Sequence, residues 1–460
     1  MTKMKDSGIR WIGEIPTNWN VIRVKDAFVR KKTKAKQKNP TILSLARSGI
    51  KIRDITNNEG QLAENYSDYN PVKIDDLVLN PMDLISGDNC NISKVEGVIS
   101  PAYINLRYKE GINPEFYNFY FKYQYWCKAF FAHGKGVSFE NRWTLNSDTL
   151  ERFPLILPPI EEQNCIVNFL KAKCSEIDSL HNDIEKQIDI LEKYKKVIIT
   201  EAVTKGFNSN VEMKNSGVEW IKEIPKNWKV NKIKYLFTSG KGLSITKENL
   251  IDDGLPVISY GQIHAKNNNS VDINKDLLRF VSYGYQKYNF NCNVKKNDFI
   301  FADTSEDKDG CGNFVYKRDD SLLFAGYHSI ILHSKIQQDN RYLAYLFLTD
   351  LWRKQLRETA SGVKVFSITQ KNLINSSIIL PPSDEQIEIA NVLDKKCYEI
   401  IKAINEKREQ LIILDNYKKS LIYEYVTGNI TDPFSFSDGQ SNSTATGATQ
   451  TTTFSRTESG

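Results

Sequence analysis

Apolar residues recur at seven-residue intervals in two long segments of the chain. In the first segment these positions hold Leu170, Ile177, Ile184, Leu191 and Ile198; in the second they hold Leu393, Ile400, Leu414 and Leu421. A seven-residue period kept over four heptads is typical of a coiled-coil seam. Lys407 interrupts the second seam, at the position where the first has Ile184. The pattern predicts two long helices.

Both segments also carry the residues expected at helix ends. Pro158-Pro159 and Pro381-Pro382 stand before them, each followed by acidic residues, and Gly206 and Gly428 follow the last turns. The stretch 162–204 alone holds 43 residues, or about 65 Å of helix. Since neither helix can bury its apolar stripe alone, we expect an antiparallel pair. The alternative is that both are ordinary buried helices of a bundle.

The remaining pattern is mixed. Short alternating runs such as Ile74–Leu79 and Ser329–Leu332 predict strands, and amphipathic helices are expected at Pro114–Phe131 and Asn340–Arg357. Of the 32 residues in 429–460, 14 are Ser or Thr with no apolar period, so this tail is predicted to be disordered.

The chain repeats itself. Asp6–Trp19 returns as Asn215–Trp228, and Leu157-Pro-Pro-Ile-Glu-Glu-Gln163 returns as Leu380-Pro-Pro-Ser-Asp-Glu-Gln386. Weaker echoes link Val72–Leu79 with Val294–Phe301, and Ile42–Leu45 with Val257–Tyr260. The expected organisation is therefore an α+β region at 1–156, a first helix at 157–206, a second α+β region at 207–379, a second helix at 380–428 and the tail at 429–460.

Composition narrows the class of protein. No apolar run approaches the ~20 residues of a membrane span, and no signal peptide is apparent at the N-terminus. Seven scattered cysteines without a C-x-x-C pair argue against disulfides and structural zinc. We expect a soluble cytoplasmic protein.

Catalytic motifs are missing from the sequence. Gly134-Lys-Gly136 and Gly240-Lys-Gly242 fall short of a phosphate-binding loop, no G-x-G-x-x-G follows a predicted strand, and the five histidines lack metal-ligand spacing. The Asn/Asp-Pro-Pro-aromatic loop of an adenine or cytosine methyltransferase is also absent. We predict a protein that is not an enzyme, with no metal site and no cofactor of its own.

The positive charge is concentrated near the N-terminus, and such a concentration is suited to binding DNA phosphates. The net charge is +6, but residues 1–40 alone carry +8, and Arg30–Lys38 holds six cations. A solvated basic loop is the alternative interpretation of that run. Arg and Asn are the favoured major-groove readers of guanine and adenine. Candidate DNA contacts are Arg30, Lys31, Lys32, Lys34, Arg47, Lys51, Arg53, Asn141, Arg142, Lys266, Asn267, Asn268 and Lys364.

The doubled Ser-Gly-x-x-Trp-x-x-x-x-Pro-x-x-Trp and Leu-Pro-Pro-x-x-Glu-Gln motifs resemble those of the DNA-specificity subunit of bacterial type I restriction–modification systems. The resemblance covers about residues 6–428. It implies two tandem α/β target-recognition domains, each reading one half of a split target in double-stranded DNA, separated by two antiparallel helices that form a coiled coil. The tryptophans and prolines of the first motif would belong to the shared framework; they are Trp11, Pro16, Trp19, Trp220, Pro225 and Trp228.

The resemblance also implies partners. The helices would dock two methyltransferase (modification) subunits, which bind S-adenosylmethionine and methylate adenine, and restriction subunits that use ATP and Mg²⁺ would join the complex. The chain itself would be non-catalytic and bind none of these cofactors. Two alternatives stay open: a coiled-coil adaptor without a DNA role, and the recognition half of a fused methyltransferase–nuclease.

Overall fold

The computed structural model describes residues 3–36, 40–46, 49–54, 66–84, 89–136, 143–208, 210–268, 270–287, 290–336 and 338–429. The chain forms two compact units. The first unit comprises Met1–Asp183 and Gln410–Gly460, and the second comprises Ile184–Glu409. The predicted tail lies outside the described residues, apart from Asn429.

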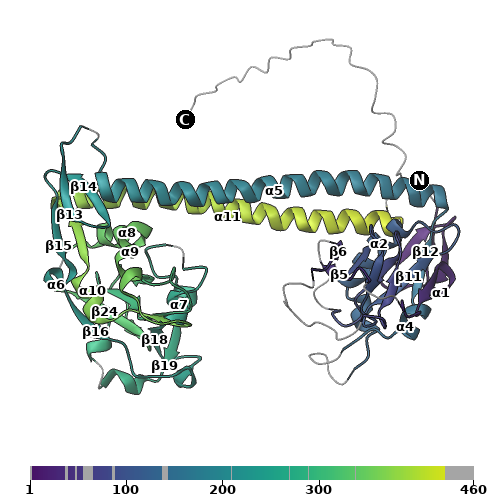
Figure 1. Ribbon diagram of the computed structural model, residues 1–460, viewed down its shortest axis with the longest axis horizontal. Helices are drawn as coiled ribbons and strands as arrows, with labels where there is room; N and C mark the ends of the chain where they lie inside the picture. The colour runs from purple at the N-terminus through teal and green to yellow at the C-terminus, as the bar shows by residue number, and fades with distance from the viewer. Residues whose placement is uncertain are drawn as a thin grey trace, which may run out of the picture. The chain divides into compact units, whose positions relative to one another are not determined.

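Two long helices, α5 (Ile160–Lys205) and α11 (Ser383–Thr427), each contribute to both units. In the first unit Lys418 lies 2.6 Å from Asp178. In the second unit Arg408 lies 3.2 Å from Glu192, and Lys407 donates to the side chain of Gln187. Within the first unit the ring of Phe169 also stacks on that of Tyr425. The contacts of this unit thus move from 425 to 418 along α11 as they move from 169 to 178 along α5, which confirms the expected antiparallel pair (Figure 1).

The expected seam residues of α5 and α11 all face away from solvent to some degree. Six are buried: Leu170, Ile177, Ile184, Leu393, Ile400 and Leu421. Three are half-buried: Leu191, Ile198 and Leu414. Lys407, at the interrupted position, makes a polar contact across the pair instead. Gly206 and Gly428 adopt φ values of 72° and 74° just past the helix ends, as a left-handed helix stop requires.

The first unit is built on a four-stranded antiparallel sheet, in the order β4-β11-β8-β9. Its strands are β4 (Phe28–Lys31), β11 (Ile104–Tyr108), β8 (Leu77–Leu79) and β9 (Cys90–Ile92). Two-stranded pairings flank it: β1 (Met4–Asp6) with β2 (Glu14–Pro16), β3 (Asn20–Arg23) with β12 (Pro154–Leu157), β5 (Leu43–Ala46) with β6 (Gly49–Ile52), and β7 (Asn70–Val72) with β10 (Gly97–Ile99). The short helices are α1 (Val24–Ala27), α3 (Ala129–Ala132) and α4 (Ser147–Arg152).

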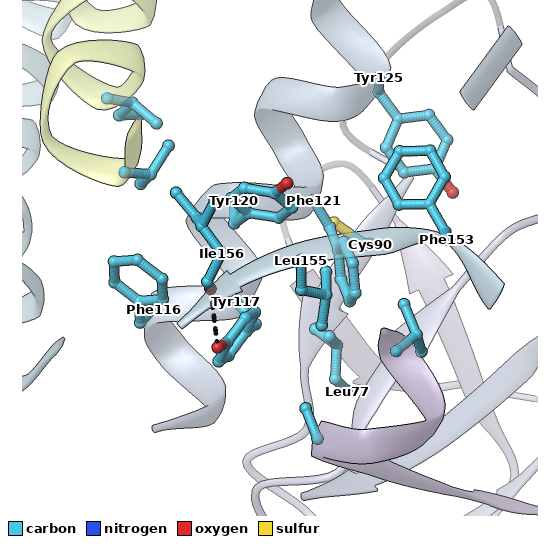
Figure 2. Packing of buried hydrophobic residues seen from close by; sticks show 14 of the residues in the cluster. Leu77, Cys90, Phe116, Tyr117, Tyr120, Phe121, Tyr125, Phe153, Leu155 and Ile156 are labelled. Carbon is cyan, nitrogen blue, oxygen red and sulfur yellow. Dashed lines mark hydrogen bonds between the residues drawn. The ribbon is translucent and has the colours of Figure 1, made fainter. Parts of the chain in front are cut away.

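Helix α2 (Pro114–Trp126) supplies the aromatic core of this unit. Asn113 caps its first turn, and Pro114 occupies a position where no N–H is needed. Figure 2 shows Tyr117, Tyr120 and Phe121 lying over β12, with the Tyr117 hydroxyl donating to the carbonyl of Ile156 at 3.0 Å. Burial raises the pKa of Tyr117 far above its ordinary value, so this hydroxyl stays a donor.

The second unit repeats this plan with additions. The equivalent sheet runs β16 (Phe237–Lys241), β24 (Ser329–Ser334), β20 (Phe299–Ala302) and β22 (Phe314–Tyr316), and β15 (Lys229–Lys232) pairs with β26 (Ser377–Leu380). A second sheet contains β17 (Leu250–Ile251), β19 (Arg279–Val281), β18 (Leu255–Ile258) and β23 (Phe324–Ala325). The remaining strands are β13 (Met213–Val218), β14 (Ile221–Pro225), β21 (Thr304–Ser305) and β25 (Phe366–Ser367). Its helices are α6 (Ile233–Leu236), α7 (Tyr260–Ile263), α8 (Arg341–Leu348), α9 (Asp350–Thr359) and α10 (Gln370–Asn375).

The structure confirms the repeat and its weak echoes. Strands β8 and β20 occupy equivalent sheet positions. Ile42 forms a parallel bridge to Val98, as Val257 does to Phe324. Both units are therefore copies of one α+β design, with longer connections in the second.

The expected single amphipathic helix of each unit is wrong in detail, because each is broken. In the first unit Lys128 takes a left-handed backbone, φ 62°, between α2 and α3. In the second unit Thr349 leaves the helical backbone after α8, and its side chain accepts from the N–H of Trp352 to start α9.

The seven cysteines are free thiols. Within the described ranges, none of the helices combines the length and the hydropathy that a membrane span requires.

Candidate nucleic-acid interface

Three polar segments of the second unit meet at one end of its sheets. The Nε2 atom of His264, after α7, lies 2.8 Å from the carbonyl oxygen of Thr304 in β21. Strand β21 pairs in turn with β25. Residues 264–268, 304–310 and 361–367 therefore lie together, and we call them the loop surface.

The candidate residues of this unit all fall on the loop surface, but they differ in how accessible their side chains are to DNA. Lys266 and Asn267 are exposed, and so is Lys364 beside the 92% exposed Val363 in a hairpin closed by Ser361 and Ser367. Asn268 is committed to its own loop, because its Nδ2 donates to the carbonyl of Ile263 at 2.8 Å.

The loop surface also carries acids that the sequence analysis missed. Glu306, Asp307 and Asp309 are exposed beside Lys308, and the Asp307 carboxylate shapes the turn by accepting from the N–H of Gly310 at 2.7 Å. Carboxylates repel phosphates but accept from the amino group of cytosine. The mixed charge therefore suits base edges better than the DNA backbone.

In the first unit, the described residues that flank the candidate loops lie at equivalent positions. The β5–β6 hairpin follows Ile42, and the bridge between Lys135 and Thr144 matches the one between Ser361 and Ser367. Lys51 is exposed, whereas Arg53 is half-buried. Three candidates lie outside the described residues: Arg47, Asn141 and Arg142.

Trp143 packs against the chain segment that follows α3. Its indole N–H donates to the carbonyl of Phe131 at 2.8 Å, and its ring covers Gly134 so closely that a Cβ there would collide with it. Gly134 of the Gly-Lys-Gly motif thus serves packing.

Two cations of the basic run Arg30–Lys38 lie close to acidic residues of the first unit. Arg30 lies on the same face of β4 as buried Phe28, opposite Leu106, and its guanidinium is 3.8 Å from Glu151. Lys34 pairs with Asp68 at 2.9 Å. Lys31 is half-buried and Lys32 is exposed. Phosphate contact is thus best supported for Lys32, and least for Arg30.

Each unit holds a buried carboxylate directly before one strand of its main sheet, Asp76 before β8 and Asp298 before β20. Asp76 accepts from Nε and Nη2 of Arg107, both at 2.7 Å, and this hydrogen bonding raises the pKa of Arg107. The equivalent Asp298 lies 2.7 Å from Nδ1 of His333 and raises the pKa of that imidazole. These pairs fix the sheets from which the loops project.

The helix pair exposes a second feature that the seam pattern did not reveal. Ile190 and Tyr194 of α5, in the second unit, are 62% and 50% exposed; Ile413 and Tyr417 of α11, in the first unit, are 65% and 55% exposed. Members of each pair are four residues apart, so they share a helix face. The two pairs occupy the same position in the two repeats. We call them the twin patches.

The arrangement defines a duplicated protein that presents polar loops from both of its units. Among the described residues, no cluster of three or more His, Cys, Asp or Glu side chains could hold a metal ion.

The chain belongs to the family of type I restriction modification DNA specificity domains, whose model matches residues 16–190 and 225–411. It is thus a non-catalytic DNA-specificity subunit of a type I restriction–modification system.

Relatives extend over nearly the whole chain. The MjaVIII specificity subunit of Methanocaldococcus jannaschii is 24% identical over 90% of this chain and 94% of its own length. The EcoBI specificity subunit of Escherichia coli is 23% identical over 83% of this chain and 80% of its own length. A solved chain from a type I restriction–modification system, studied for its assembly and conformational transition, has a TM-score of 0.67 at 14% identity and covers 90% of this chain and 99% of that chain.

Proposed function

We propose that each unit reads one half of a split sequence in double-stranded DNA. The observation that carries this proposal is the equivalent placement of the candidate loops on two copies of one framework. Lys266, Asn267 and Lys364 supply donors in the second unit, and Lys51 supplies one in the first. The helix pair sets the gap between the half-targets.

The proposal extends to partners. The twin patches give the chain two copies of one exposed apolar site, which suits two copies of a modification subunit. Those subunits bind S-adenosylmethionine and methylate adenine, and restriction subunits that use ATP and Mg²⁺ complete the complex. The complex works in the cytoplasm, a reducing compartment that suits seven free thiols.

Two other functions are less well supported. An adaptor without a DNA role leaves the loop surface unexplained. The recognition half of a fused enzyme fits poorly with relatives that are specificity subunits matched over 94% and 80% of their lengths.

The test is to map methylated adenines in cells that express the complex with Lys266→Ala and Asn267→Ala together. We expect one half of the target to relax, by about tenfold to a hundredfold in preference, because a lost base contact costs ~1–3 kcal/mol. The other half and the gap should stay unchanged.

Lys229→Ala is the matched control, since this exposed lysine lies on β15, away from the loop surface. An unaltered target in the double variant, or relaxation of both halves, would contradict the proposed reading of one half by this unit.

A further inference from the structure

The second unit contains a cavity of about 530 Å³ between the two long helices, the loop that follows α7, and the start of α9. Lys195 and Lys196 of α5 and Arg408 of α11 reach it from the helices. Lys266 and Arg353 reach it from the opposite side. Five cations therefore converge on a space large enough for one small molecule.

Among the described residues that line this cavity, two are acids, and both have partners. Glu192 lies 3.2 Å from Arg408, and Asp350 lies 2.8 Å from Arg357, which is outside the cavity lining. The lining keeps an excess of three positive charges. Such an excess in a partly buried space is unfavourable until an anion enters.

The hydrogen bonds of Arg353 illustrate this excess of positive charge. Its Nε donates to the carbonyl of Phe347 at 2.9 Å and its Nη1 to the side-chain oxygen of Asn313 at 2.6 Å, so both of these acceptors are neutral. Burial lowers the pKa of Arg353 to about 10, and burial also lowers the pKa of Lys195. Both groups remain cations at neutral pH.

The first unit provides an internal comparison. Lys418 and Lys419 are the repeat equivalents of Lys195 and Lys196. There Lys418 pairs with Asp178 at 2.6 Å, and Lys419 lies over the ring of Trp126. In the second unit the same lysine pair lines the cavity.

We propose that this cavity binds a nucleoside phosphate. The guanidinium of Arg353 and the lysines match a phosphoryl group, for which arginine offers a planar set of donors. Ile199, Leu348 and Ile404 supply the apolar wall that a base requires. Because Lys266 belongs to the loop surface, the ligand touches both a DNA-reading loop and the helix pair.

The test is calorimetric titration of the full chain with AMP, ADP and inorganic phosphate. We expect saturable binding of the nucleotides, with phosphate alone at least tenfold weaker because it leaves the apolar wall uncovered. Lys196→Gln, at an exposed position, should weaken nucleotide binding about tenfold, and Arg353→Gln by more.

Lys419→Gln is the matched control, being the repeat equivalent of Lys196, and should leave the affinity unchanged. The proposal is overturned if neither nucleotide binds at millimolar concentration, or if Lys196→Gln binds as the unaltered chain does. It is also overturned if duplex DNA displaces the nucleotide from the cavity, since the phosphate would then be that of the DNA backbone. Circular dichroism of Lys196→Gln checks that a loss of affinity does not reflect unfolding.

Discussion

The indole Nε1 of Trp19 donates to Oε2 of Glu162 at 2.7 Å, and the amide of Asn18 donates to Oε1 of the same carboxylate at 2.6 Å. One repeated motif is thus bonded to the other, since Glu162 belongs to the Leu-Pro-Pro-x-x-Glu-Gln segment that begins α5. The second unit repeats the contact between Trp228 and Glu385, at 3.1 Å. The two motifs recur together because each supplies half of one joint.

Glu162→Ala should destabilise the first unit by about 1–3 kcal/mol, because two hydrogen bonds to an ionised group are lost and the indole N–H of Trp19 is left without its acceptor. Glu385→Ala should cost less, since its bonds to Trp228 and Asn227 are longer, at 3.1 and 3.3 Å. Urea denaturation of each variant measures the difference. A larger loss of stability for Glu385→Ala would show that the stabilisation by these two joints does not follow the lengths of their hydrogen bonds.

The sequence predicts the helices and the repeat well, because both depend on local spacing. Heptads and Pro-Pro starts need only neighbours along the chain. The joint between Trp19 and Glu162 could not be predicted, since 143 residues separate its partners. The availability of Arg30 also could not be predicted, because it depends on Glu151, which only folding brings near. That of Asn268 depends on a hydrogen bond to the carbonyl of Ile263, five residues earlier, which the residue pattern does not specify.

The pairing of His333 with Asp298 predicts a pH-dependent second unit. The folded pKa of His333 is raised, so its stabilising effect is fully present below the unfolded value of about 6.5 and is lost as the pH rises through the folded value. Amide protection in β20 and β24 should therefore be lower at a pH above the raised folded pKa than at a pH below about 6.5.

Strands β8 and β11 are the internal control for this loss, because Arg107 fills the equivalent position and does not titrate in that range. His333→Gln should abolish the difference between the two pH values. A similar fall in both units, or its persistence in His333→Gln, would assign the pH effect to another group.

The basic run predicts unequal effects on DNA binding. Lys32→Ala should reduce the slope of log affinity against log salt by about 0.9, the value for one phosphate contact. Arg30→Ala should leave the slope nearly unchanged, because Arg30 is half-buried beside Glu151. Fluorescence anisotropy across a salt series measures both slopes. Equal reductions would mean that Arg30 leaves Glu151 for the DNA.

The twin patches predict stepwise loss of partners. Tyr194→Glu should remove one modification subunit, and Tyr417→Glu one as well, because each places a charge in an apolar contact. Native mass spectrometry of the assembled complex counts the subunits, and the double variant should bind none. Ile336→Glu is the control, since Ile336 is 55% exposed and lies outside both long helices. Retention of both partners by the double variant would place docking elsewhere.

The assignment of the gap to the helix pair predicts that its length can be changed without altering what is read. One heptad inserted after Asp183 and another after Glu409 would lengthen α5 and α11 together, by about 10 Å at ~1.5 Å per residue, and keep their seams in phase. The methylated target should keep both half-sequences and gain about three base pairs between them at ~3.4 Å each. Four residues inserted into α5 alone should instead abolish assembly, because the seam of α5 would then be out of phase with that of α11. A target with its original gap in the heptad variant would show that the helices do not set the spacing.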